Sequence, residues 1–211
     1  MKNICFVAMA ILVLALTGCG SDGVVVSVNP PPVVVSHILS DALLDGDIEV
    51  STGLTVIRQS VTQSVFVGLD PLSLTETRAF LDFSLSSIPG NAIINSATLD
   101  FVVDSINPSS AVVPMLVDLV SFSQPLLAVD FVRAFLVTTP IVPPIAFADI
   151  GNHVSVDVTS LMQEAQRQGL SHFQVRLLKG SGGTSVGVVE INDTTGPNRA
   201  LRAPQLTVIY L

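Results

Sequence analysis

Apolar and polar side chains alternate with a period of two along much of the chain. In residues 79–85 the odd positions are apolar and the even positions are partly polar, and alternation resumes over residues 97–103. This pattern is typical of β-strands with one buried face. Pro89 and Gly90 lie in a turn between the two segments. We therefore expect these segments to be neighbouring antiparallel strands.

Further segments have the composition of strands and are separated by turn residues. They comprise residues 54–58, 64–68, 115–122, 154–158, 173–177, 185–191 and 205–210. Their spacing predicts an all-β fold of the sandwich type, and the chain length favours a single domain. Between residues 123 and 148, Pro140, Pro143 and Pro144 interrupt an apolar stretch, and we expect loops around a strand or two there.

One segment carries the signals of a helix. Ser160 suits an N-cap, Gln163 would complete a capping box, and Gly169 stands where a C-cap glycine belongs. The sequence therefore predicts one short helix over about residues 161–168.

The start of the chain has the layout of a secretion signal. Lys2 precedes an apolar run over residues 4–16, which is shorter than the roughly 20 residues that a membrane-spanning helix needs. Residues 16–19, Leu-Thr-Gly-Cys, resemble the bacterial lipobox, in which the cysteine is acylated after cleavage. The expectation is a signal peptide over 1–18 and a lipid anchor on Cys19. The alternative is an ordinary signal peptide whose cleavage site contains a cysteine.

Residues 19–36 read as the lipidated cysteine followed by a tether rich in valine and proline. Pro30, Pro31 and Pro32 favour an extended polyproline conformation. The alternative is that one of the valine triplets pairs as an edge strand of the domain over residues 37–211. The lipobox resemblance, with Gly20 after the cysteine, implies lipid-anchored delivery to the outer membrane or cell surface.

Charge and cysteine usage exclude some classes of function. The chain carries a formal charge of −8, and removal of the leader with Lys2 makes the balance more negative, which argues against a nucleic-acid partner. Cys5 would leave with the leader and lipid would consume Cys19, so no disulfide or zinc cluster is expected. The chain has no tryptophan and ten phenylalanines, most of them on core-facing positions, so a flat aromatic platform is hard to assemble.

Motifs that would carry catalysis are weak. Residues 183–187 match the nucleophile-elbow pattern G-x-S-x-G around Ser185, but a strand rather than a helix follows, and all three histidines precede the serine. We therefore predict no enzymatic activity and no cofactor beyond a structural calcium ion. The candidate calcium ligands are the densest group of acidic residues, Asp41, Asp45, Asp47 and Glu49. The alternative for this group is a solvated acidic loop.

Three segments together resemble a known family. Residues 78–99, RAFLDFSLSSIPGNAIINSATL, are similar to the hallmark of DNRLRE-type domains, 156–161 to the strand that leads into their short helix, and 204–210 to their closing strand. The resemblance implies a jelly-roll β-sandwich of the carbohydrate-binding-module type. It implies extracellular polysaccharide as a partner, and the candidate ligand-binding residues are basic: Arg176, Lys179, Arg199 and Arg202. The alternative is a structural or adhesive envelope protein that binds another protein.

Overall fold

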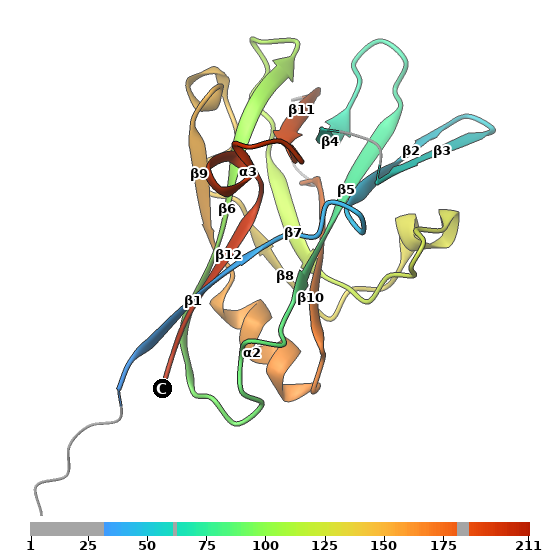
Figure 1. Ribbon diagram of the computed structural model, residues 1–211. Helices are drawn as coiled ribbons and strands as arrows, with labels where there is room; N and C mark the ends of the chain where they lie inside the picture. The colour runs from blue at the N-terminus through green and yellow to red at the C-terminus, as the bar shows by residue number, and fades with distance from the viewer. Residues whose placement is uncertain (1–31, 61–62, 181–185) are drawn as a thin grey trace, which may run out of the picture. The chain divides into compact units, whose positions relative to one another are not determined.

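The alternating segments form antiparallel β-strands in the computed structural model of the chain (Figure 1). The structure describes residues 32–60, 63–180 and 186–211, which lie within one unit, Pro32–Leu211. The predicted signal peptide, Cys19 and most of the predicted tether lie outside the described residues. None of the described helices is long and apolar enough to cross a membrane.

The first half of the described chain contains six strands. They are β1 (Val34–Leu39), β2 (Gly46–Ser51), β3 (Leu54–Gln59), β4 (Ser64–Leu69), β5 (Glu76–Ser84) and β6 (Ile94–Asn107). The second half contains β7 (Met115–Leu119), β8 (Val137–Pro140), β9 (His153–Asp157), β10 (His172–Lys179), β11 (Gly187–Asn192) and β12 (Gln205–Tyr210). The helices are α2 (Thr159–Arg167) and α3 (Arg199–Arg202), with the 3-10 turns η1 (Ala128–Val132) and η2 (Phe147–Asp149). The structure thus confirms the all-β antiparallel sandwich with a short helix, and adds the four-residue α3, which the sequence did not predict.

The long strand β6 connects the two layers of the sandwich. Its first part pairs with β12 and β9, whereas its last residues, from Val103 on, pair with β11. From β11 the hydrogen-bonded order continues through β4, β5, β10 and β7 to β8, and β2 pairs with both β3 and β5. At the other end β1 pairs with β12.

The prediction that residues 79–85 and 97–103 are neighbouring strands is wrong. β5 pairs with β2, β4 and β10, and β6 pairs with other partners. The link between them crosses from one layer to the other. Its first amide, Leu85, donates to the carbonyl of Ser171, and Ile93 near its end exchanges hydrogen bonds with Leu211. Pro89 and Gly90 therefore lie in a connection between the two layers and not in a hairpin turn.

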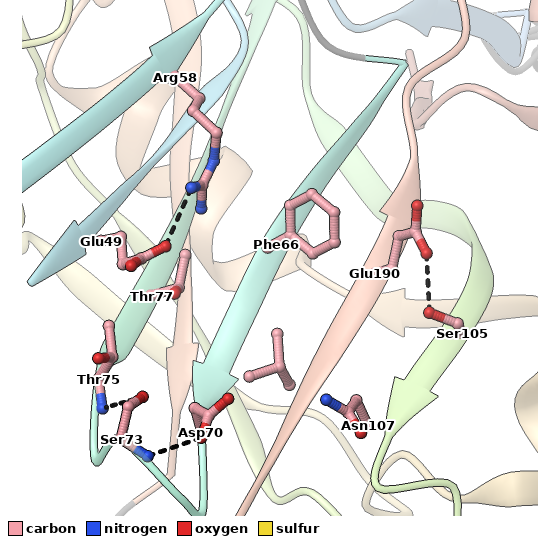
Figure 2. Close-up of a pocket in the computed structure, with 11 residues that line it drawn as sticks. Glu49, Arg58, Phe66, Asp70, Ser73, Thr75, Thr77, Ser105, Asn107 and Glu190 are labelled. Atoms are coloured by element: carbon pink, nitrogen blue, oxygen red, sulfur yellow. Dashed lines mark hydrogen bonds and ion pairs between the residues drawn. The ribbon is translucent and has the colours of Figure 1, made fainter.

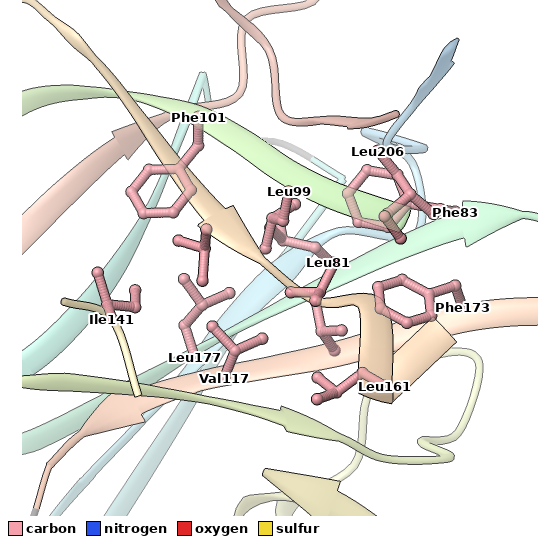
Figure 3. Packing of buried hydrophobic residues seen from close by; sticks show 14 of the residues in the cluster. Leu81, Phe83, Leu99, Phe101, Val117, Ile141, Leu161, Phe173, Leu177 and Leu206 are labelled. Carbon is pink, nitrogen blue, oxygen red and sulfur yellow. The ribbon is translucent and has the colours of Figure 1, made fainter. Parts of the chain in front are cut away.

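The main hydrophobic core fills the space between the layers (Figure 3). Leu81 and Phe83 of β5 lie in the same buried cluster as Leu99 and Phe101 of β6, and Leu161 of α2 joins them. All five side chains are fully buried. The inward positions of the alternating pattern are therefore those that form the core.

β5 is buried on both of its faces, which the alternating pattern did not predict. Phe80 packs on the face opposite the main core, where its ring meets Phe122 edge-on at a centroid distance of 5.3 Å. Leu126 and Phe131 complete this second cluster, with Ile48 of β2 beneath them. The segment around η1 therefore covers part of the outer face of the sheet and leaves the rest uncovered.

The helix α2 lies close to its predicted position, but a different residue begins it. The first backbone amide of the helix, that of Thr159, donates to Asp157 Oδ1 at 2.9 Å, so Asp157 takes the role that was predicted for Ser160. At the other end Gly169 has a φ of +66°. The amide of Leu170 donates to Ala165 and that of Gly169 to Gln166, which is the Schellman arrangement that the C-cap glycine predicts.

The end of the predicted tether belongs to the sheet. β1 begins at Val34 and pairs with β12 over six residues, from Val34 opposite Tyr210 to Leu39 opposite Gln205. Val34 and Val35 of the second valine triplet thus belong to an edge strand, which is the alternative that the sequence left open.

Candidate ligand-binding groove

A groove of about 370 Å³ lies on the uncovered outer face of the sheet (Figure 2). Side chains of β2, β3, β4, β11, the start of β5 and the end of β6 line it, together with the loop from Asp70 to Thr75. Phe66 lies in it because Val65 and Val67 on either side point into the main core, so that alternation directs Phe66 outward.

Three lining residues form a row across adjacent strands. Glu190 of β11 stands opposite Phe66 of β4 on one side and opposite Ser105 of β6 on the other. The hydroxyl of Ser105 donates to Glu190 Oε2 at 2.7 Å. Strand register therefore places an aromatic ring, a carboxylate and a hydroxyl side by side in the groove.

Arg58 of β3 forms the opposite wall of the groove. Its Nη2 lies 2.6 Å from Asp47 Oδ1 and its Nη1 lies 2.9 Å from Glu49 Oε2. The guanidinium carbon is 5.6 Å from the centroid of the Phe66 ring, within the range of a cation–π interaction. Two carboxylates and one aromatic ring thus hold the guanidinium in place.

Asp47 supports this wall from beneath. Its side chain is fully buried, and its Oδ2 accepts the backbone amide of Phe66 at 3.2 Å. Burial raises the pKa of Asp47 to about 6, although the hydrogen bond and charge of Arg58 act to lower it. Asp47 therefore connects the position of Arg58 to the backbone of the strand that carries Phe66.

The loop between β4 and β5 forms one end of the groove. Asp70 Oδ1 accepts the amides of Leu72 at 2.7 Å and Ser73 at 2.9 Å, and these bonds lower the pKa of Asp70. Leu72 and Leu74 are largely exposed, and Leu74 has a φ of +55°. Residues other than glycine seldom adopt this left-handed conformation. The loop thus presents two apolar side chains beside a fixed carboxylate.

The predicted calcium ligands do not converge on one point. Asp47 and Glu49 bind Arg58 in the groove wall, whereas the exposed Asp41 accepts the amide of Leu43 with its Oδ1. Asp45 is buried, and its Oδ1 accepts the amide of Asp82 at 2.7 Å. Across the part of the chain that the structure describes, no group of three or more acidic, histidine or cysteine side chains is placed to hold a metal ion.

Asp45 instead lies near an acidic residue far along the chain, Asp193. Both side chains are buried, and burial raises both pKa values: that of Asp193 to about 6 and that of Asp45 well above its ordinary value. Arg199 of α3 lies 3.3 Å from Asp193 and also donates to the carbonyl of Ser40. One predicted ligand-binding residue, Arg199, therefore connects α3 to the segment that follows β1.

The other predicted basic residues are spread over the molecule. Arg176 of β10 is buried, and it lies 2.6 Å from Asp118 of β7 and donates to the carbonyls of Phe131 and Arg133. Arg202 lies 2.6 Å from Asp104, and Lys179 ends β10. None of the four is among the residues that line the groove.

Sequence reasoning missed Phe66, Glu190 and Ser105 as site residues. A signal for Phe66 was present, because a phenylalanine between two valines of an alternating strand falls on the face away from the core. For Glu190 and Ser105 no local signal exists, since only the order of the strands brings them beside Phe66. Ser185 of the nucleophile-elbow pattern lies outside the described residues.

Comparison with models of known protein families and with curated proteins found no match. The fold is therefore known from the structure, and the side chains that line the groove indicate what it can bind.

Proposed function

We propose that this protein is a lipid-anchored binding protein at the outer membrane or cell surface, and that its β-sandwich binds extracellular polysaccharide without catalysis. The groove that contains Phe66 is the proposed binding site. The observation that carries the proposal is the arrangement of an outward-facing aromatic ring among side chains that can exchange hydrogen bonds with hydroxyl groups.

Sugar rings combine apolar faces with hydroxyl groups around their edges. Phe66 and Val188 supply an apolar surface in the groove, to which a sugar face can pack. Around them stand the hydroxyls of Thr75, Thr77 and Ser105 and the amide of Asn107. This combination of a small apolar surface and several polar groups is typical of small-ligand sites.

The proposal is tested with the whole purified chain in detergent on a panel of immobilised polysaccharides. Phe66→Ala should weaken binding by about tenfold, because loss of the ring removes the apolar surface on which a sugar packs. Phe147→Ala is the matched control, since Phe147 is exposed and lies outside the groove.

Retention of the wild-type chain on no polysaccharide would contradict the proposal. Equal binding by the two phenylalanine variants would assign the binding to another surface. Release of shortened products from a bound polymer would refute the non-catalytic part of the proposal.

A second candidate function is adhesion to another envelope protein. The segment around η1 favours it, because five large apolar side chains there are exposed: Leu127, Val129, Val132, Phe135 and Leu136. The buried Phe131 and the bonds of Arg176 to this segment hold it against the sheet. A stable complex that Val132→Asp and Phe135→Asp abolish, together with unchanged behaviour on polysaccharides, would support this second function.

A further inference from the structure

The groove is acidic, and the one cation among the described residues that line it, Arg58, already forms ion pairs. Three carboxylates line it, on Glu49, Asp70 and Glu190, together with one guanidinium, on Arg58. Arg58 contacts both Glu49 and the buried Asp47 at 2.9 Å or less. The lining therefore carries excess negative charge. Because Asp47 and Glu49 neutralise Arg58, its guanidinium attracts an anionic ligand only weakly.

Asp70 and Glu190 are the carboxylates of the groove that Arg58 does not neutralise. The described residues donate to Glu190 through Ser105, at Oε2, and to Asp70 through two backbone amides, at Oδ1. These donors are neutral, so none of these hydrogen bonds places a positive charge against either carboxylate. Figure 2 shows Phe66 between the Arg58–Glu49 pair and Glu190. A ring packed on Phe66 would thus have at its edge the carboxylate of Glu190, which pairs with no cation among the described residues of the groove.

We propose that the groove selects a polysaccharide whose sugar units carry free amino groups, with their ammonium groups bound by Glu190 and Asp70. This inference rests on the proposed function and names the class of its ligand. Ammonium groups donate charge-assisted hydrogen bonds to carboxylates, whereas the carboxylates of a polyuronate would meet like charges in the groove.

Two oligosaccharides with the same backbone isolate the amino group. Calorimetry with the whole chain in detergent compares oligomers of glucosamine with oligomers of N-acetylglucosamine, at low salt and just below neutral pH. Acetylation removes the positive charge and leaves the ring and its other hydroxyls in place. A uronic-acid oligomer supplies the anionic comparison. We expect the free amine to bind most tightly and added salt to reduce its advantage.

Isosteric variants test whether the groove itself recognises the charge. Glu190→Gln keeps an oxygen that can accept from Ser105, and Asp70→Asn keeps one for the two backbone amides, so both variants should fold. Each should weaken binding of the glucosamine oligomer by about two- to fivefold and leave the N-acetylated oligomer nearly unaffected. Glu164→Gln on α2 removes the same charge outside the groove and is the matched control.

The outcomes separate this inference from the proposed function. Equal or tighter binding of the acetylated or uronic oligomer, with loss of binding in Phe66→Ala, overturns the amino-sugar preference and leaves the polysaccharide function standing. A preference for the amine that the two carboxylate variants do not reduce also overturns it. Binding of none of the oligomers also overturns the amino-sugar preference, and it contradicts the proposed function as well when the chain is retained on no polysaccharide of the panel.

Discussion

Asp47 is the residue through which pH acts most directly on the groove wall. Its folded-state pKa of about 6 lies above the ordinary value of 3.8 because the side chain is buried. An acid whose pKa rises on folding binds its proton more tightly in the folded state. Its contribution to stability is therefore complete below the unfolded pKa and is lost as the pH rises through about 6.

We predict that the free energy of unfolding increases as the pH is lowered from neutral toward about 4, by up to about 3 kcal/mol from Asp47. Asp193 and Asp45, whose pKa values are also raised by burial, act in the same direction. Denaturant unfolding measured across this pH range tests the prediction. Asp47→Asn should flatten the slope, whereas Asp41→Asn, at an exposed position, should flatten it far less, because Asp41 only adds to the raised pKa of Asp193. Stability that instead falls between neutral pH and about 5 would refute it.

A second prediction at this scale concerns the buried ion pair of Arg176 and Asp118. Arg176→Met should lower the free energy of unfolding by about 3–5 kcal/mol, because it leaves a buried carboxylate without a partner. It also removes the donor to the carbonyls of Phe131 and Arg133. Adding Asp118→Leu to the Arg176→Met variant should recover part of the lost free energy of unfolding. Denaturant unfolding of both single variants and the double variant measures this coupling.

The matched control for this ion pair is Arg167→Met. Arg167 pairs with Glu164 on the surface of α2, where solvent screens the interaction, so little change is expected. Equal losses from the two arginine variants would show that burial does not determine the effect.

Among the elements, α2 offers a test of how a single glycine ends a helix. Gly169 has a φ of +66°, a conformation that costs an alanine about 1–2 kcal/mol. We predict that Gly169→Ala lowers the melting temperature by a few degrees. Gly90→Ala is the control, because Gly90 has open space around it and lies outside the left-handed region. A melting temperature that is unchanged by Gly169→Ala would contradict the assigned C-cap.

Signals that act within one element were sufficient to predict most strands and the helix. Alternation located β5 and β6, and Gly169 located the end of α2. The pairing of β5 and β6 was not predictable in the same way, because a turn sequence such as that at Pro89 fits a hairpin and a crossing equally well. Phe80 is buried by a segment some 40 residues further along the chain. A pattern within β5 alone cannot predict a contact with a segment so distant in the sequence.

At the scale of the whole molecule, the candidate site was less predictable than the fold. The acidic cluster of the sequence divides in the structure between Arg58 and Asp193, because strand pairing decides which charges meet. Of the predicted site residues that the structure describes, Glu49 alone lines the groove. The groove combines six strands and one loop, so its composition follows from topology that the sequence did not fully specify.

The proposed anchor gives a prediction for the complete chain in cells. Cys19→Ala should abolish incorporation of labelled fatty acid and leave the chain as an uncleaved precursor, because the acylated thiol is the substrate for cleavage. Cys5→Ala, within the apolar run, is the matched control and should behave as the wild type does. Fatty-acid labelling of both variants, combined with membrane fractionation, measures whether each one is acylated and cleaved. Continued labelling of Cys19→Ala would refute the anchor.

The pairing of β1 with β12 has a mechanical consequence for the proposed function, in which lipid anchors the chain at Cys19 and the groove binds a polymer. Chain that enters the sheet at Val34 transmits a pull along the axis of β1. The six residue pairs from Val34 and Tyr210 to Leu39 and Gln205 are then loaded in shear, so that they resist together instead of opening one after another. We expect this strand pair to set the force at which the sandwich yields to a moving polymer.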